Sequence, residues 1–181
     1  SGVVVAPDNY FPRVENLLTK YDIMMWSDEV ICGFGRTGSN FGCETMGFTP
    51  KLISLAKQLS SAYLPISASV IPEYMHEAMI EPSSKVGVFG HGYTYTGHPA
   101  ACAAALKTLE IYQRDNLFGH AADMGEYLQD KLSEFKNHPL VGEVRGRGLI
   151  GAVELVANKE TGEAFKDLAV GAHAKQACQD N

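Results

Sequence analysis

Two titratable residues, Asp28 and Lys57, stand at the ends of apolar segments of strand length. Asp28 lies near the end of Ile23–Val30, and Lys57 directly follows Leu52–Ala56. A carboxylate or an ammonium group is seldom buried without a partner, because the loss of hydration is costly. Two interpretations are open. The residues form an ion pair with each other, or they line a ligand site at the carboxyl ends of a parallel sheet, where such folds bind ligands.

A third feature is the segment His91–Pro99, with the sequence HGYTYTGHP. It is rich in hydroxyl groups and glycine and leads into a helical pattern, which suits a loop that holds a phosphate. Such a loop is also often no more than a helix cap. The spacing of His91 and His98 fits neither one helical turn nor a usual metal pairing. We therefore predict loop histidines and no metal site.

The glycine pattern GxGxxG occurs twice, at Gly33–Gly38 and at Gly146–Gly151. A dinucleotide site requires a helix that opens at these glycines and an acidic residue about 20 positions later. The residues after Gly38 have poor helical periodicity, and those after Gly151 resemble a strand. We interpret both patterns as tight turns.

The elements that position these residues follow from the apolar pattern. Residues 11–21 have helical spacing behind Pro12, whereas 23–30, 52–56 and 66–71 are short apolar runs. Continuous apolar strands beside helices are typical of a parallel sheet covered on both faces, so this part is predicted to be α/β. From Pro99 the pattern changes to two helices, and Val141–Val156 then alternates like a pair of strands that opens a smaller α+β unit.

Composition sets further limits. The chain has 181 residues, a formal net charge of −6 and 45% hydrophobic residues, which is typical of a globular protein with a sizeable core. It has no run of Lys or Arg that would indicate a nucleic acid or an anionic membrane as partner. The spacing of its four cysteines matches no zinc motif, so we expect free thiols and a cytoplasmic protein.

Five segments of the chain, taken in order, resemble the signature of class III aminotransferases, most strongly the omega-amine:pyruvate branch. They are Trp26–Val30 (WSDEV), Gly33–Gly38 (GFGRTG), Ala56–Ile66 (AKQLSSAYLPI), His91–Pro99 (HGYTYTGHP) and Val141–Gly148 (VGEVRGRG). The resemblance implies the large domain of fold type I, with a mixed, mostly parallel sheet and helices on both faces. It assigns residues 1–98 to this domain, 99–116 to a connecting helix and 117–181 to the beginning of a smaller α+β C-terminal domain.

The resemblance also implies the roles of individual residues toward pyridoxal 5′-phosphate. Lys57 would hold the cofactor as a Schiff base and then move the proton, and Asp28 would bind the ring N–H. Val30, two residues on along a strand, would pack against one face of the ring. Thr94 and the backbone of Tyr93 would bind the phosphate of the cofactor held by the other subunit, which implies a homodimer, or a dimer-based tetramer, with shared active sites.

The implied function is transfer of an amino group from a primary amine or omega-amino acid to a keto acid in a ping-pong cycle. Pyruvate is the keto acid that the resemblance favours. Two alternatives remain open: an aminomutase or decarboxylase of the same family, and a non-enzymatic structural or interaction domain with Asp28 and Lys57 as a buried ion pair. Lys51 and Gln58 depart from the family's usual residues. The family's Gly-Ser phosphate loop, ring-stacking aromatic residue and carboxylate-binding arginine have no counterpart here, so we expect an internal fragment.

Overall fold

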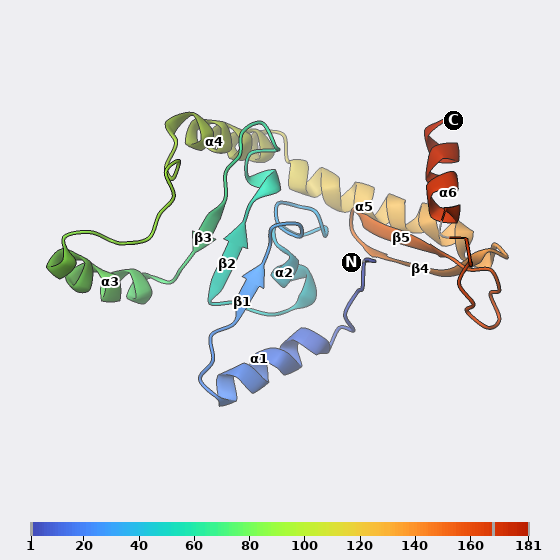
Figure 1. Cartoon of the computed structure of the whole chain (residues 1–181), viewed down its shortest axis with the longest axis horizontal. Helices are drawn as coiled ribbons and strands as arrows, with labels where there is room; N and C mark the ends of the chain where they lie inside the picture. Colours follow the sequence, from blue (N-terminus) through green and yellow to red (C-terminus); the bar gives the residue numbers. More distant parts are fainter. Residues whose placement is uncertain (1, 168, 181) are drawn as a thin grey trace. The chain divides into compact units, whose positions relative to one another are not determined.

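A mixed three-stranded sheet lies at the centre of residues 6–123 (Figure 1). The computed structural model describes residues 2–167 and 169–180. Strands β1 (Trp26–Asp28) and β2 (Leu52–Leu55) are parallel, and β3 (Ala68–Val70) runs antiparallel on the other edge of β2. The mixed sheet confirms the predicted fold class, although each strand is shorter than the apolar run that predicted it.

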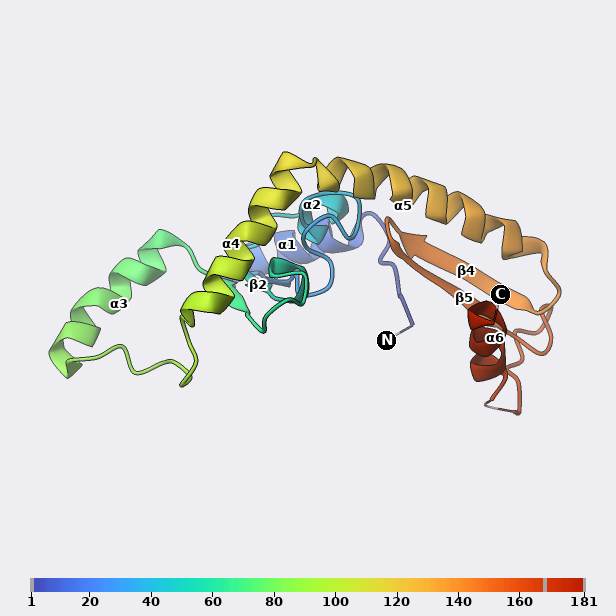
Figure 2. The same ribbon diagram turned by 90° about the horizontal axis from the view of Figure 1, so that it is seen from above.

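The same unit contains helices as well as this sheet. They are α1 (Tyr10–Lys20), α2 (Gly42–Met46), α3 (Glu73–Val86) and α4 (Pro99–Arg114). Helix α4 begins with Pro99 at its first turn, as its sequence predicts. It lies beside the short 3-10 helix η1 (Lys57–Leu59) in both views (Figures 1 and 2). The buried residues Leu55, Leu59 and Ala105 join the sheet, η1 and α4 in one core.

Two helices were not predicted. Helix α2 is only five residues long, and α3 contains Pro82 in its interior and buries none of its residues. A proline lacks the backbone N–H that a helix interior uses, so it weakens the helical signal of the sequence. The first glycine pattern, Gly33–Gly38, lies in successive turns, and the second lies across the turn of a β-hairpin. Both confirm the prediction of tight turns.

The second unit comprises residues 2–5 and 124–180 (Figure 2). Helix α5 (Leu117–Ser133) enters it and leads through the 3-10 helix η2 (Glu134–Asn137) to the antiparallel strands β4 (Val141–Arg147) and β5 (Ile150–Leu155). Helix α6 (Val170–Gln179) follows. A Cβ added at Gly125 of α5 would lie 2.8 Å from the Cα of Gly148, so the helix backbone contacts the hairpin turn directly. The strand pair expected at 141–156 is confirmed.

The predicted domain boundaries at 98/99 and 116/117 stay predictions. The two units that the structure separates meet within α5, between Asp123 and Met124. Within the described residues, no helix is both long and apolar enough to cross a membrane.

Candidate active site

The parallel pairing of β1 and β2 places Asp28 and Lys57 at the same edge of the sheet. Asp28 is the last residue of β1 and pairs with Ser54 of β2. The backbone N–H of Glu29 then donates to the carbonyl oxygen of Ser54 at 3.0 Å. Lys57 follows three residues after Ser54, as the first residue of η1. The structure therefore brings together the two residues that the apolar runs singled out, at the carboxyl ends of adjacent parallel strands.

The backbone of Lys57 is in the left-handed region, with a φ of 47°. A residue with a Cβ rarely adopts this conformation, and such residues gather at functional sites, where the surrounding structure imposes them. The carbonyl oxygen of Lys57 accepts hydrogen bonds from the N–H groups of Ser60 (3.2 Å) and Ala62 (3.3 Å). The Lys57 side chain is exposed and has no ion pair or hydrogen bond with the described residues. Its amine is thus available to a ligand.

The expected burial of Asp28 was wrong. We expected a buried carboxylate, but Asp28 is exposed, and no ion pair joins it to Lys57 within the described chain. The buried ion pair proposed for a non-enzymatic domain is therefore not formed. Asp28 Oδ1 accepts a hydrogen bond from the backbone N–H of Val30 at 3.0 Å, and this bond turns the chain after β1. The second oxygen, Oδ2, is left for another donor.

The buried carboxylate of this segment belongs to Glu29, which the sequence analysis did not single out. Glu29 directly follows β1, and its side chain is 1% exposed; Ser27 of β1 is buried as well. Glu29 Oε1 accepts from Ser27 Oγ (3.0 Å) and the N–H of Cys43 (2.8 Å), and Oε2 accepts from the N–H of Gly42 (2.7 Å). Glu29 thus fixes the N-terminus of α2 to β1.

Two thiols lie near this carboxylate. Burial, followed by the charge of Glu29 and its hydrogen bond, raises the pKa of Cys43 to about 11. Burial, then the charges of Glu29 and Asp28, also raises the pKa of Cys32. Both thiols are therefore neutral near pH 7, and all four cysteines of the chain are free, as predicted.

Val30 lies outside the strand that was expected to hold it. Strand β1 ends at Asp28, and Val30 lies in the turn that follows. The alternation of side chains along a strand therefore does not apply to it, and the argument that Asp28 and Val30 share one strand face was wrong. The early end of the strand follows from the hydrogen bond between Asp28 Oδ1 and the N–H of Val30. Contact of Val30 with a cofactor ring stays a prediction.

The loop with Tyr93 and Thr94 is not joined to Asp28 or Lys57 by any contact among the described residues. All residues from 84 to 100 are exposed. The N–H of Tyr93 donates to Thr96 Oγ1 at 2.8 Å, so this donor is already used within the loop. The hydroxyl group of Thr94 has no hydrogen-bond partner in the described chain. The Thr94 hydroxyl group is thus available to bind an anion.

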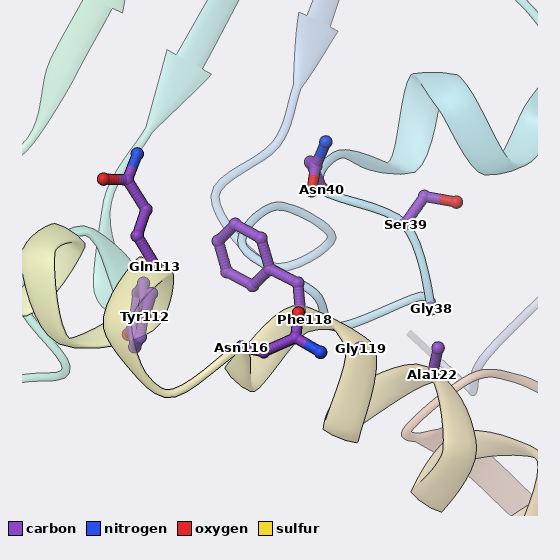
Figure 3. Close-up of a pocket in the computed structure, with 9 residues that line it drawn as sticks. All are labelled: Gly38, Ser39, Asn40, Tyr112, Gln113, Asn116, Phe118, Gly119 and Ala122. Carbon is purple, nitrogen blue, oxygen red and sulfur yellow. The ribbon is translucent and has the colours of Figure 1, made fainter.

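A pocket of about 400 Å³ lies beside these elements, between the glycine turn and the junction of α4 with α5 (Figure 3). Its lining is mostly polar or small: Gly38, Ser39, Asn40, Tyr112, Gln113, Asn116, Phe118, Gly119 and Ala122. Neither Asp28 nor Lys57 lines it. Tyr112 connects the two regions, because its hydroxyl group donates to the carbonyl oxygen of Gln58 at 2.8 Å.

With this geometry established, comparison with known proteins is decisive. The family model for "Aminotransferase class-III" matches residues 1–177. The chain belongs to the class III aminotransferases. Members of this family use pyridoxal 5′-phosphate. This membership confirms the resemblance inferred from five segments.

Curated relatives include transaminases with different substrates in their names. The chain is 43% identical over 181 residues to the putrescine–pyruvate aminotransferase of Pseudomonas aeruginosa, covering 99% of this chain and 39% of the relative. It is 42% identical over 180 residues to gamma aminobutyrate transaminase 2 of Solanum lycopersicum, with the same coverage. This class III chain thus spans about two fifths of the length of the relatives it matches.

Solved structures agree with the fold. A transaminase described with L-Ala superposes with a TM-score of 0.94 at 47% identity, covering 99% of this chain and 42% of that chain. The omega transaminase of Pseudomonas jessenii in complex with PMP superposes with a TM-score of 0.88 at 46% identity, covering 93% of this chain and 37% of that one. The mixed α/β fold of this class III chain is therefore that of transaminases.

Proposed function

We propose that this chain carries the lysine and the ring-binding carboxylate of an aminotransferase that moves an amino group from a primary amine or omega-amino acid to a keto acid, with pyruvate as the first candidate. One observation carries the proposal. Asp28 and Lys57 end adjacent parallel strands, with the ε-amine of Lys57 unpaired and its backbone in the left-handed region. The family membership supports the type of reaction.

The side chains present fit pyridoxal 5′-phosphate. The Lys57 amine is exposed and can bind an aldehyde covalently, and Asp28 Oδ2 is left to accept a ring N–H. When bound, pyridoxal phosphate supplies a ring that takes up the electron pair left at the substrate carbon. Lys57 Nζ would accept the proton from that substrate carbon as a general base and then donate it again as a general acid to complete the proton transfer. The negative charge of Asp28 favours a protonated ring nitrogen throughout.

Three further residues of this chain belong to the proposed cofactor site. Val30, in the turn that Asp28 closes, would contact the ring. Thr94 would donate to the phosphate through its hydroxyl group, which has no partner among the described residues. The backbone N–H of Tyr93 would join it by exchanging its bond to Thr96 Oγ1 for one to the phosphate. Because the described residues of the Thr94 loop contact neither Asp28 nor Lys57, we propose that this loop serves the site of a second subunit in a homodimer. The four free cysteines support a cytoplasmic location, where thiols stay reduced.

The choice of substrates rests on two named relatives. One is named for putrescine and pyruvate, and another for gamma aminobutyrate. Both donors carry a primary amine at the end of an aliphatic chain. We therefore propose terminal amines as donors, to be screened as diamines, β-alanine, taurine and aromatic amines, followed by pyruvate.

The test is Lys57→Ala in the full-length protein, with Lys51→Ala as the matched control. Lys51 is an exposed lysine just before β2 and is not part of the proposed site. We expect Lys57→Ala to lose amino transfer completely while still binding the cofactor non-covalently, and Lys51→Ala to keep wild-type rates. In the wild-type protein, borohydride should fix the cofactor on the peptide that contains Lys57. Amino transfer that persists in Lys57→Ala, or cofactor fixed on another lysine, contradicts the proposal.

A further inference from the structure

The turn that carries Lys57 is held from outside by one hydroxyl group. Tyr112, near the end of α4, donates its O–H to the carbonyl oxygen of Gln58 at 2.8 Å. Its oxygen also lies 2.5 Å from Ser61 Oγ. A tyrosine hydroxyl has one donor and can also accept, so Ser61 donates to Tyr112 while Tyr112 donates to Gln58. A single side chain thus clamps the turn at both sides of Leu59.

This turn needs such support. Lys57, Ser61 and Ala62 all have positive φ, at 47°, 48° and 61°. None of them is glycine, so each adopts a conformation that its Cβ disfavours and that the surroundings must impose. Within the turn, the N–H groups of Ser60 and Ala62 donate to the carbonyl oxygen of Lys57, and the N–H of Ser61 donates to the carbonyl oxygen of Gln58. They shape the turn but do not fix it to the rest of the protein.

The other contacts that hold this turn act through side chains, whereas Tyr112 binds the backbone. Leu59 packs in the core against Ala105, which attaches the middle of the turn to α4. The Gln58 side-chain oxygen lies 3.0 Å from Arg36 Nη2 when the amide is oriented to satisfy both groups. Tyr112 binds the backbone carbonyl of Gln58 from α4, and that carbonyl also accepts the N–H of Ser61 at 3.2 Å within the turn. Tyr112 therefore limits rotation of the peptide between Gln58 and Leu59, the second peptide after Lys57.

We propose that Tyr112 is a positioning residue, whose hydroxyl group holds the strained turn 57–62 so that the amine of Lys57 faces the edge of the sheet beside Asp28. This inference rests on the proposed role of Lys57. The aromatic ring itself packs against Phe34 and Phe118, with centroids 6.4 Å and 5.4 Å apart. Tyr112→Phe therefore keeps the packing and removes only the hydroxyl group.

The first readout needs no cofactor. In the full-length, cofactor-free protein, amide hydrogen exchange reports the hydrogen bonds from Ser60 and Ala62 to Lys57. One lost hydrogen bond should make these amides exchange about 2- to 10-fold faster in Tyr112→Phe. Tyr127→Phe is the matched control, because Tyr127 is 59% exposed and lies in the other unit. It should leave these amides unchanged, and unchanged exchange in Tyr112→Phe overturns the inference.

The second readout separates positioning from mere stability. With cofactor bound, Tyr112→Phe should lower kcat for amino transfer about 2- to 10-fold while KM for the amine stays constant, since the proton transfer by Lys57 is affected and amine binding is not. Faster exchange with wild-type kcat also overturns the inference. Ser61→Ala removes one of the two hydroxyl contacts and should give a smaller change in the same direction. It replaces Tyr112→Phe if that variant does not fold.

The Lys57→Ala variant separates failure of the proposed function from failure of the positioning role of Tyr112. If Lys57→Ala transfers amino groups, the proposed function fails, whatever Tyr112→Phe does. If Lys57→Ala is inactive and Tyr112→Phe behaves like Tyr127→Phe in both readouts, the function stands and only the positioning role is wrong.

Discussion

Replacing Glu29 by Gln should loosen the segment between β1 and α2. The carboxylate accepts two hydrogen bonds at Oε1 and one at Oε2. The glutamine side chain has one acceptor oxygen and one NH2 group in place of the two acceptor oxygens. Either the N–H of Gly42 or that of Cys43 must therefore face the NH2 group, which is itself a donor. A hydrogen bond to a charged group contributes roughly 1.5–3 kcal/mol to stability. The variant recovers part of this lost stability because it no longer buries a charge. We expect a net loss of about 2 kcal/mol, which is about 30-fold in the local opening equilibrium.

The thiol of Cys43 reports this opening. It is 7% exposed, and its pKa is raised to about 11 by burial and, next, by Glu29. In Glu29→Gln the labelling reagent reaches the Cys43 thiol more often. The loss of the Glu29 carboxylate also lowers the pKa of this thiol toward the ordinary value. We expect iodoacetamide at pH 8 to label Cys43 at least about 30-fold faster than in the wild-type protein. Trypsin separates Cys43 from Cys32, because Arg36 lies between them.

Two controls make the result specific. Glu44→Gln is the same substitution within α2, the helix that Glu29 binds, but the Glu44 side chain is exposed. Among the described residues it accepts one long bond, 3.3 Å from the N–H of Phe41. It should leave the labelling of Cys43 nearly unchanged. Cys102 of α4 should react at the wild-type rate in both variants if the opening is local. Wild-type labelling of Cys43 in Glu29→Gln refutes the view that Glu29 fixes α2 to β1.

Two further predictions concern the proposed cofactor site. Asp28→Asn should keep the shape of the turn but remove the charge that favours a protonated ring nitrogen, so kcat should fall roughly 10²- to 10³-fold; a wild-type kcat would mean that Asp28 only forms the turn with Val30. Thr94→Ala should raise the dissociation constant of the cofactor about 10- to 150-fold, measured by titration of the cofactor-free protein, with little change in kcat at saturation. An unchanged dissociation constant would remove Thr94 from the phosphate site. If Thr94 serves the partner, mixing inactive Lys57→Ala and Thr94→Ala chains at limiting cofactor should restore activity after subunit exchange.

The carboxyl edge of the sheet was predictable because its signal is local. The apolar runs are short, a charged residue lies at or near the end of the first two, and the strands lie within a pattern that also contains helices. These features lead to a parallel pair with Asp28 and Lys57 at one edge, as the structure has it. The clamp on Lys57 was not predictable in this way. Tyr112 and Gln58 lie 54 positions apart, and nothing in either segment indicates that a hydroxyl group of α4 meets a backbone carbonyl after β2.

The adjacent carboxylates of Asp28 and Glu29 show where sequence reasoning stops. One ends β1 and the other directly follows it, and the sequence does not say which of the two is covered. The covering element is α2, whose five residues carry no recognisable periodicity and whose first N–H groups bind Glu29. Those hydrogen bonds occupy both oxygens of Glu29, whereas Asp28 uses only Oδ1. A ligand at this edge would therefore meet Asp28 as the available carboxylate, because both oxygens of Glu29 already accept hydrogen bonds within the protein.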